Sequence, residues 1–187
     1  QLCDLNGSLT DISIPHAGHV LAVDDQGYVL CQYPVTRTVR TDSGTMPYTF
    51  HQYTLLGSDF SVLLDNIDEY YNVGQYDYSC DSELFYNDLV AVRVGATDWY
   101  LPDGGPWPRL YFNSKYMFID HSGKTVSSSR YDEVSHENDR WFGCHGTTEY
   151  LLDSNGNERE QANYCYVPST WAENIVEQAE KDGLRLS

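Results

Sequence analysis

The sequence predicts a mainly β fold of consecutive antiparallel hairpins, of repeat type, with one C-terminal α-helix. Three observations point to it: a recurring turn motif between short apolar runs, a high aromatic content, and scarce helix signals before residue 168. Of the 187 residues, 16 are Tyr, six are Phe and four are Trp, and aromatic rings pack well on pleated, half-buried surfaces. The length is that of one domain, so we expect residues 1–187 to form a single unit.

A turn motif with Asp at its first position and Gly three residues later occurs three times. It begins at Asp24, Asp120 and Asp153, each time directly after an apolar run. The Asp carboxylate caps the amides of such a turn, and Gly accepts a positive φ without penalty. Each motif therefore predicts a hairpin that ends in a bulge. With a looser version at residues 99–104, the motifs place hairpin units near residues 18–32, 84–104, 110–134 and 140–160.

Further elements follow from apolar runs and from proline and glycine. We expect strands at residues 48–56, 60–64, 84–94 and 110–112, with a buried core at 88–94. Residues 102–108 are predicted as a loop, and residues 34–47 as a long excursion between two prolines.

The end of the chain carries the signals of a helix. Thr170 and Glu173 form a capping box, apolar residues then recur at helical spacing, and Gly183 supplies a stop. These signals predict the C-terminal helix over about residues 170–181.

Charge restricts the partners that this chain can bind. The net charge is −17; residues 1–92 hold two basic and 13 acidic side chains, a balance of −11, and residues 93–187 hold the remaining −6. Such a field repels nucleic-acid backbones and anionic membranes and attracts basic proteins. It also serves solubility alone. We therefore expect no nucleic-acid partner, and no apolar run is long enough for a membrane span.

The five cysteines, Cys3, Cys31, Cys80, Cys144 and Cys165, are dispersed and include no C-x-x-C pair. This spacing argues against a zinc ribbon or a thioredoxin-like site, and the odd number leaves at least one cysteine unpaired within the chain. Two disulfides can form in an oxidising compartment, so we expect a secreted or cell-surface protein.

The second turn motif extends into a longer pattern. Residues 116–126 read aromatic–apolar–apolar–Ile–Asp–x–x–Gly–Lys–x–Val, and Tyr-Asp-x-Val follows at residues 131–134. This string resembles the tryptophan–glycine (WG-type) repeat of bacterial proteins, best over residues 85–160 and more weakly at 20–30. There is no Trp-Gly dipeptide, and Met117 stands where the family has Gly. The resemblance implies a β-rich repeat module for binding or interaction, without catalytic residues of its own.

Partial motifs for chemistry are present, but each is incomplete. His16 and His19 lie three apart without further ligands at matching spacing. Cys144 and His145 are adjacent, and on a strand they point to opposite faces; a paired or buried Cys144 is the ordinary alternative, with Cys165 as a plausible partner. Residues 153–160 alternate oxygen ligands but lack the frame of a calcium loop. Acids at 65, 68 and 69 resemble the paired carboxylates of glycosidases, yet a chain this acidic clusters carboxylates anyway. We predict no enzyme, no metal and no cofactor.

Aromatic residues around the proline-rich loop are the candidate binding residues: Trp99, Tyr100, Trp107, Tyr111 and Trp141. Flat rings with a polar edge suit sugar stacking or a protein hot spot; the alternative is that these rings fill the core. We therefore expect a non-catalytic module that recognises protein or glycan through aromatic loops. The alternative function is an acidic, immunity-type antagonist that neutralises a basic partner through carboxylates of residues 59–88.

Overall fold

The chain is mainly β, as predicted. The computed structural model describes residues 2–3, 9–10, 14–71, 83–103 and 110–164; the predicted helix at 170–181 lies outside them. The elements are β1 (Leu2–Cys3), β2 (Leu9–Thr10), the 3-10 helix η1 (Pro15–Ala17), β3 (His19–Val23), β4 (Val29–Thr41), β5 (Gly44–Leu56), β6 (Val62–Tyr70), β7 (Val90–Val94), β8 (Trp99–Tyr100), β9 (Tyr111–Phe112), β10 (Tyr116–Ile119), β11 (Glu133–Glu137), β12 (Arg140–His145), β13 (Thr148–Leu152) and β14 (Glu158–Tyr164).

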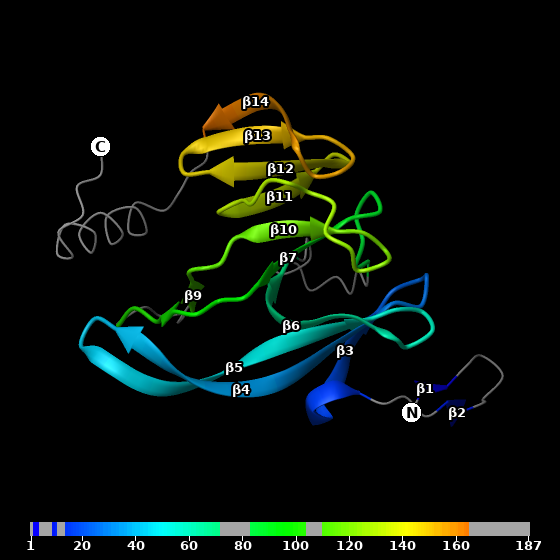
Figure 1. The fold of residues 1–187 in the computed structure, drawn as a ribbon, viewed down its shortest axis with the longest axis vertical. Helices are drawn as coiled ribbons and strands as arrows, with labels where there is room; N and C mark the ends of the chain where they lie inside the picture. Colours follow the sequence, from blue (N-terminus) through cyan, green and yellow to red (C-terminus); the bar gives the residue numbers. More distant parts are fainter. Residues whose placement is uncertain (1, 4–8, 11–13, 72–82, 104–109, 165–187) are drawn as a thin grey trace.

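The strands form three sheets. β1 and β2 make a small pair; β10-β7-β6-β5-β4-β8-β9, with β3 also on β4, make an eight-stranded sheet; β11-β12-β13-β14 make a four-stranded antiparallel sheet. Figure 1 shows the four-stranded sheet above β10 and the long β4–β5 hairpin along the lower border. A bridge between Tyr116 and Tyr131 links β10 to the chain that enters the four-stranded sheet. None of the helices in the described ranges is long and apolar enough to cross a membrane.

The longest feature is the hairpin of β4 and β5, called the ribbon below. Its register runs from Val29↔Leu56 to Thr41↔Gly44, so the predicted excursion at residues 34–47 is wrong. The prolines are tolerated because Pro34 and Pro47 stand at positions where the backbone points away from the partner strand. A missing N–H breaks no ladder hydrogen bond there.

The three predicted Asp turns have one geometry. In each, the Asp Oδ1 accepts hydrogen bonds from the backbone N–H groups two and four residues later, at 2.8–3.1 Å. The glycines Gly27, Gly123 and Gly156 have φ of 85°, 76° and 71°, so the turn needs a residue that accepts a left-handed backbone.

A fourth turn of the same hydrogen-bonding kind connects β5 to β6 and was not predicted. Gly57 N–H donates to the Ser61 carbonyl and Phe60 N–H donates to the Gly57 carbonyl, both at 2.8 Å. Phe60 occupies the left-handed position with φ 65°, where the motif has Gly. Because the motif has Gly at this position, the sequence pattern did not predict this turn.

Two tight turns of Asn followed by Asp also depart from the prediction. Asn87 and Asp88 have φ of 52° and 63°, and Tyr86 and Leu89 exchange backbone hydrogen bonds across them. The predicted strand at 84–94 is thus interrupted, and only its second part forms β7. Nor is 84–104 a hairpin unit, because β7 pairs with β6 and β10 whereas β8 pairs with β4 and β9. A second such pair at residues 138–139 joins β11 to β12.

Apolar side chains gather in two main clusters. The first packs the large sheet against residues 84–85 and includes Leu30, Leu55 and Ile67. The second joins β10 to the four-stranded sheet and includes Phe118, Tyr131 and Trp141. The predicted buried strand at 88–94 is confirmed in its β7 part, whose side chains contribute to both clusters.

Arg93 ties the two sheets together from β7. Its guanidinium lies 2.9 Å from a Glu69 carboxylate oxygen and 3.3 Å from one of Glu133. It also donates to the carbonyls of Ser114 and Asp132, and its side chain is only 4% exposed. A buried cation needs such a set of acceptors, so Arg93 fixes β6, β7 and the entry to β11 relative to one another.

Candidate functional site

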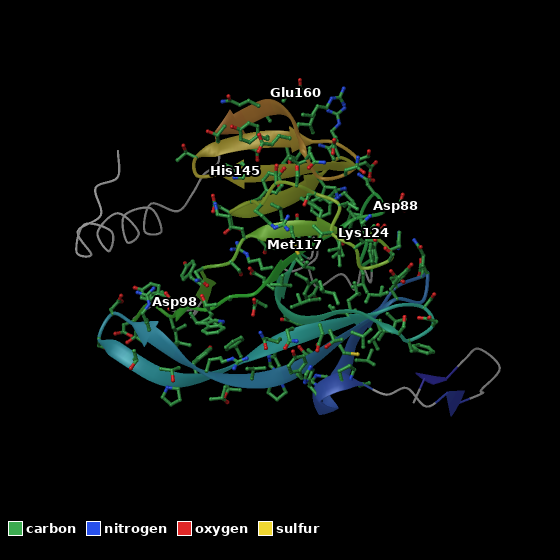
Figure 2. All side chains as sticks on the ribbon, in the orientation of Figure 1. Asp88, Asp98, Met117, Lys124, His145 and Glu160 are labelled. Atoms are coloured by element: carbon green, nitrogen blue, oxygen red, sulfur yellow. The ribbon has the colours of Figure 1, made fainter. Side chains whose placement is uncertain are left out.

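Three of the five predicted binding residues meet at the end of the ribbon that is distant from β3. β8 pairs antiparallel with β9, which places Tyr100 opposite Tyr111 with ring centroids 6.4 Å apart. β8 also joins β4 through a parallel bridge between Arg40 and Tyr100. Figure 2 shows Asp98, next to β8, beside this end of the ribbon and far from His145 on the four-stranded sheet. Tyr100 and Tyr111, predicted as part of an aromatic loop, therefore lie on paired strands.

Trp99 packs on the ribbon with one side and is partly exposed to solvent. Its ring packs against Phe50 of β5, with centroids 6.0 Å apart, and the Arg37 guanidinium lies 5.7 Å from the ring centroid. Trp99 is half-buried, whereas Arg37 is exposed. We call Arg37, Arg40, Phe50, Trp99, Tyr100 and Tyr111 the aromatic platform. A guanidinium over an indole is attracted to the electron-rich ring face.

Tyr100 is fixed at both ends of its side chain. Its hydroxyl donates to an Asp42 carboxylate oxygen, and this hydrogen bond raises the pKa of Tyr100 to about 12. The Arg40 guanidinium lies 5.9 Å from the ring centroid and forms a two-pronged ion pair with Asp98, at 2.9 and 2.5 Å. The other Asp42 oxygen accepts from Asp103 N–H at 2.9 Å. The ring is therefore pre-oriented, which lowers the entropy cost of binding a partner.

The chain that enters β8 is anchored by two side chains. Asp68 on β6 accepts the Ala96 N–H at 2.8 Å, and Asn113 accepts the N–H groups of Thr97 and Asp98 at 2.9 and 3.1 Å. Through these bonds the platform is fastened to the large sheet and to β9.

The remaining predicted binding residues do not join the platform. Trp141 is 3% exposed and belongs to the core that β10 shares with the four-stranded sheet. Its Nε1 donates to the Tyr86 carbonyl at 2.9 Å. As a surface binding residue, Trp141 is thus corrected to a core residue. Trp107 lies outside the described residues.

The acids at 65, 68 and 69 have separate structural partners. Asp65 accepts from Thr54 at 2.6 Å and from His16 at 2.8 Å; these bonds outweigh partial burial and hold the pKa of Asp65 below its ordinary value. Asp68 is 3% exposed, and burial raises the pKa of its carboxyl although Ala96 and Gln52 donate to it. Glu69 pairs with Arg93. Each carboxylate is already engaged within the fold.

The histidines of the partial metal motif also have structural partners within the fold. His16 bonds Asp65 and stacks on Tyr33 with ring centroids 4.3 Å apart, while His19 lies 2.6 Å from the Gln32 amide nitrogen. The two histidines thus have separate partners. Throughout the described segments no group of three or more His, Cys, Asp or Glu is placed to hold a metal ion.

Cys144 is disulfide-bonded, so its sulfur is no free nucleophile. Its neighbour His145 lies 2.9 Å from Glu158 and packs on Tyr131. The Asp153 carboxylate, at the start of the calcium-like run, accepts two backbone N–H groups of its own turn. These contacts support the structural alternatives for both motifs.

Arginines complete the platform, and the sequence analysis did not assign them to it. Arg37 and Arg40 were visible as the two basic residues of the acidic first half. Their connection to Trp99 and Tyr100 needed the parallel bridge between β4 and β8, which joins residues 60 positions apart. A local pattern cannot reveal such a pairing.

Comparison with protein-family models, curated proteins and solved structures finds no match for this chain.

Proposed function

We propose that this chain is a non-catalytic interaction module that binds a protein partner through the aromatic platform. The observation that carries the proposal is that Trp99, Tyr100 and Tyr111 are half-buried at one end of the ribbon. One exposed arginine lies over the ring of Trp99 and another over that of Tyr100. Trp, Tyr and Arg are the residues that dominate binding energy at protein interfaces. Their rings are held in place before any partner arrives, which favours affinity.

The platform suits a protein better than a glycan. Sugar stacking needs an open ring face, but guanidinium groups lie over the rings of Trp99 and Tyr100. The Tyr100 hydroxyl, which would otherwise read a sugar hydroxyl, is already bonded to Asp42. Trp99 Nε1 is buried and has no hydrogen-bond partner among the described residues, so this donor is not presented to a sugar hydroxyl.

The proposal includes an extracytoplasmic location and a degenerate WG-type repeat. Two features support them. The Cys144 disulfide fits an oxidising compartment. The turns at Asp120 and Asp153 have the same hydrogen bonds 33 residues apart, and the turn at Gly57 follows that at Asp24 by the same 33 residues. A fixed spacing of one turn type is what a repeat would produce.

The acidic antagonist receives no comparable support. It requires a dense and available carboxylate face from residues 59–88. Among the acids of that range which the structure describes, Asp59 caps its own turn, Asp65 and Asp68 accept internal hydrogen bonds, and Glu69 pairs with Arg93. Glu83 and Asp88 are exposed, and Asp88 lies 3.2 Å from His121; two exposed carboxylates do not make a dense face. We therefore do not propose it.

Site-specific photo-cross-linking tests the proposal. A benzophenone amino acid is placed at Tyr111, and separately at Glu160 on β14 as the control position. In extract from the source organism we expect a discrete cross-linked protein from position 111 alone, and its loss when Trp99→Ala is added. Equal products from both positions would contradict the proposal. Trp99-dependent binding to a glycan array without any protein product would replace the protein partner with a glycan.

A further inference from the structure

We propose that the outer edge of β4, at residues 34–38, is a docking site for an extended peptide segment that adds as a further strand and carries a carboxylate beside Arg37. The inference rests on the proposed function, which it deepens by naming the partner's conformation and chemistry. Strand addition at a free sheet edge is a recurring mode of peptide recognition, in which main-chain hydrogen bonds supply affinity and side-chain contacts supply specificity.

One hydrogen bond shows which backbone groups of β4 face its outer edge. Leu101 N–H donates to the Arg40 carbonyl at 2.8 Å, so Arg40 faces away from β5 and towards β8. Backbone groups alternate along a strand. Thr38, Thr36 and Pro34 therefore face the same outer edge as Arg40.

This edge is open in its middle and occupied at both ends. β3 pairs with β4 up to His19↔Gln32, and β8 pairs with it at Arg40↔Tyr100. Between them, no described residue pairs with the outer edge of β4. Pro34, Thr36, Arg37 and Thr38 are all exposed. The interval is seven residues, about 24 Å at ~3.4 Å per residue, which is enough for a strand of ordinary length.

The open interval offers a defined set of hydrogen-bonding groups. Thr36 and Thr38 each present an N–H and a carbonyl, whereas Pro34 presents only a carbonyl. The chain itself shows that this edge accepts a strand, since β8 pairs with it in parallel one step further on. Because Pro34 has no N–H and Arg40 is paired with β8, an incoming strand would pair mainly with Thr36 and Thr38, beside the aromatic platform.

The charge of Arg37 favours a peptide that carries a carboxylate. The Arg37 guanidinium is exposed and forms no contact ion pair with a described residue; it lies over Trp99. A carboxylate on the incoming strand would supply a charge-assisted partner for it. A second copy of this chain is disfavoured because each copy carries a net charge of −17. A contact ion pair with Arg37 acts at short range, so physiological salt screens it less than it screens the net charge of the whole chain.

A proline scan with a matched control tests the site. Thr36→Pro removes an N–H from the outer edge of β4. Thr49→Pro is the control, because Thr49 lies opposite Thr36 in the same pair and its N–H faces the other edge of the ribbon. Both changes leave the β4–β5 ladder hydrogen bonds intact. The probe is acetyl-Thr-Val-Glu-Val-Thr-amide, titrated into the full chain and followed by amide NMR.

We expect the probe to shift the amides of residues 35–40, with binding retained in T49P and weakened by about tenfold or more in T36P. N-methylation of the probe at alternate residues should abolish binding, and Arg37→Gln should weaken the Glu probe but not its Gln analogue. Equal binding by T36P and T49P, or no binding by the native chain, overturns the inference. Shifts confined to Trp99 and Tyr111 would also overturn it while leaving the proposed function standing.

Discussion

At the residue scale, two glycines with a left-handed backbone differ in what surrounds them. Gly156 has φ 71°, and a Cβ there would lie 2.5 Å from Phe118 Cδ2. Gly146 has φ 56° but open space around the same position. Both glycines avoid the strain of a left-handed backbone, and only Gly156 also avoids a clash.

We predict that Gly156→Ala costs more stability than Gly146→Ala. The left-handed backbone should cost each variant about 1–2 kcal/mol. The clash with Phe118 should add about 1–3 kcal/mol to Gly156→Ala alone. Urea unfolding of the two variants beside the native chain measures the difference. Equal losses would show that Gly156 does not pack on Phe118.

Two aspartates on β6 should respond to pH with opposite signs. The pKa of Asp68 is raised by burial, so the folded state holds its proton more tightly than the unfolded state. Its contribution to stability therefore increases as the pH falls towards the ordinary Asp value of 3.8. The pKa of Asp65 is lowered, so its contribution is present above 3.8 and is lost as the pH falls through its folded-state value.

We predict that Asp68→Asn removes a stabilising rise on acidification, and that Asp65→Asn removes a stabilising contribution at neutral pH. In Asp68→Asn the Gln52 amide can turn over to keep its hydrogen bond. Unfolding free energies measured from pH 3 to pH 7 test both variants. A loss of stability on acidification that is unchanged in Asp65→Asn would refute the assignment.

Residue-level prediction succeeded where the chemistry of a turn is local. Asp24, Asp120 and Asp153 each cap their own turn, and sequence spacing alone locates them. It failed at Phe60, which takes the left-handed position without being Gly. It failed also at Asn87 and Asp88, because both take a left-handed backbone without Gly and apolar residues flank them on both sides.

At the element scale, the ribbon shows why prolines misled the prediction. Proline is read as a strand breaker, yet its effect depends on whether its N–H would have faced the partner strand. Pro34 and Pro47 both stand at outward positions of the 13-residue strands. The spacing between prolines does not reveal this. Residues that face the partner strand alternate with residues that face outward, and the pair at the tip, Thr41↔Gly44, sets where this alternation begins.

The same alternation of inward-facing and outward-facing N–H groups makes a prediction for β5. Tyr48→Pro should destabilise the chain by about 2–3 kcal/mol, because the Tyr48 N–H faces β4 and its loss leaves the Arg37 carbonyl unpaired. Thr49→Pro should cost under about 1 kcal/mol, because its N–H faces outward. Thermal unfolding of both variants tests the register; a more damaging Thr49→Pro would mean that the ribbon is out of phase by one residue.

Arg93 provides a second element-level test, since it joins β6, β7 and the entry to β11. Arg93→Met should cost about 3–5 kcal/mol, because Glu69 and two carbonyls lose a buried partner. Adding Glu69→Gln should recover part of the loss by removing the unpaired charge. Denaturant unfolding of the single and double variants measures this coupling. Strictly additive losses would show that Arg93 and Glu69 are independent.

At the scale of the whole molecule, the sequence predicted the fold class, but it separated exposed from buried aromatic residues only in part. Trp99, Tyr100 and Tyr111 lie close in the chain around one loop, so their proximity was predictable. Trp141 was assigned to the same surface, although packing between β10 and the four-stranded sheet buries it. Which ring is exposed depends on pairings between distant segments, and local sequence does not encode them.

The central claim is that protein binding resides on the aromatic platform. Once cross-linking has supplied the partner, the most direct measurement is its affinity, by calorimetry, for Trp99→Ala and for Phe142→Ser on the four-stranded sheet. Unfolding curves confirm that both variants are folded. The account predicts a loss of about tenfold or more in Trp99→Ala and an unchanged affinity in Phe142→Ser. Unchanged binding by Trp99→Ala, with loss in Phe142→Ser, would contradict it and place the interface on the four-stranded sheet.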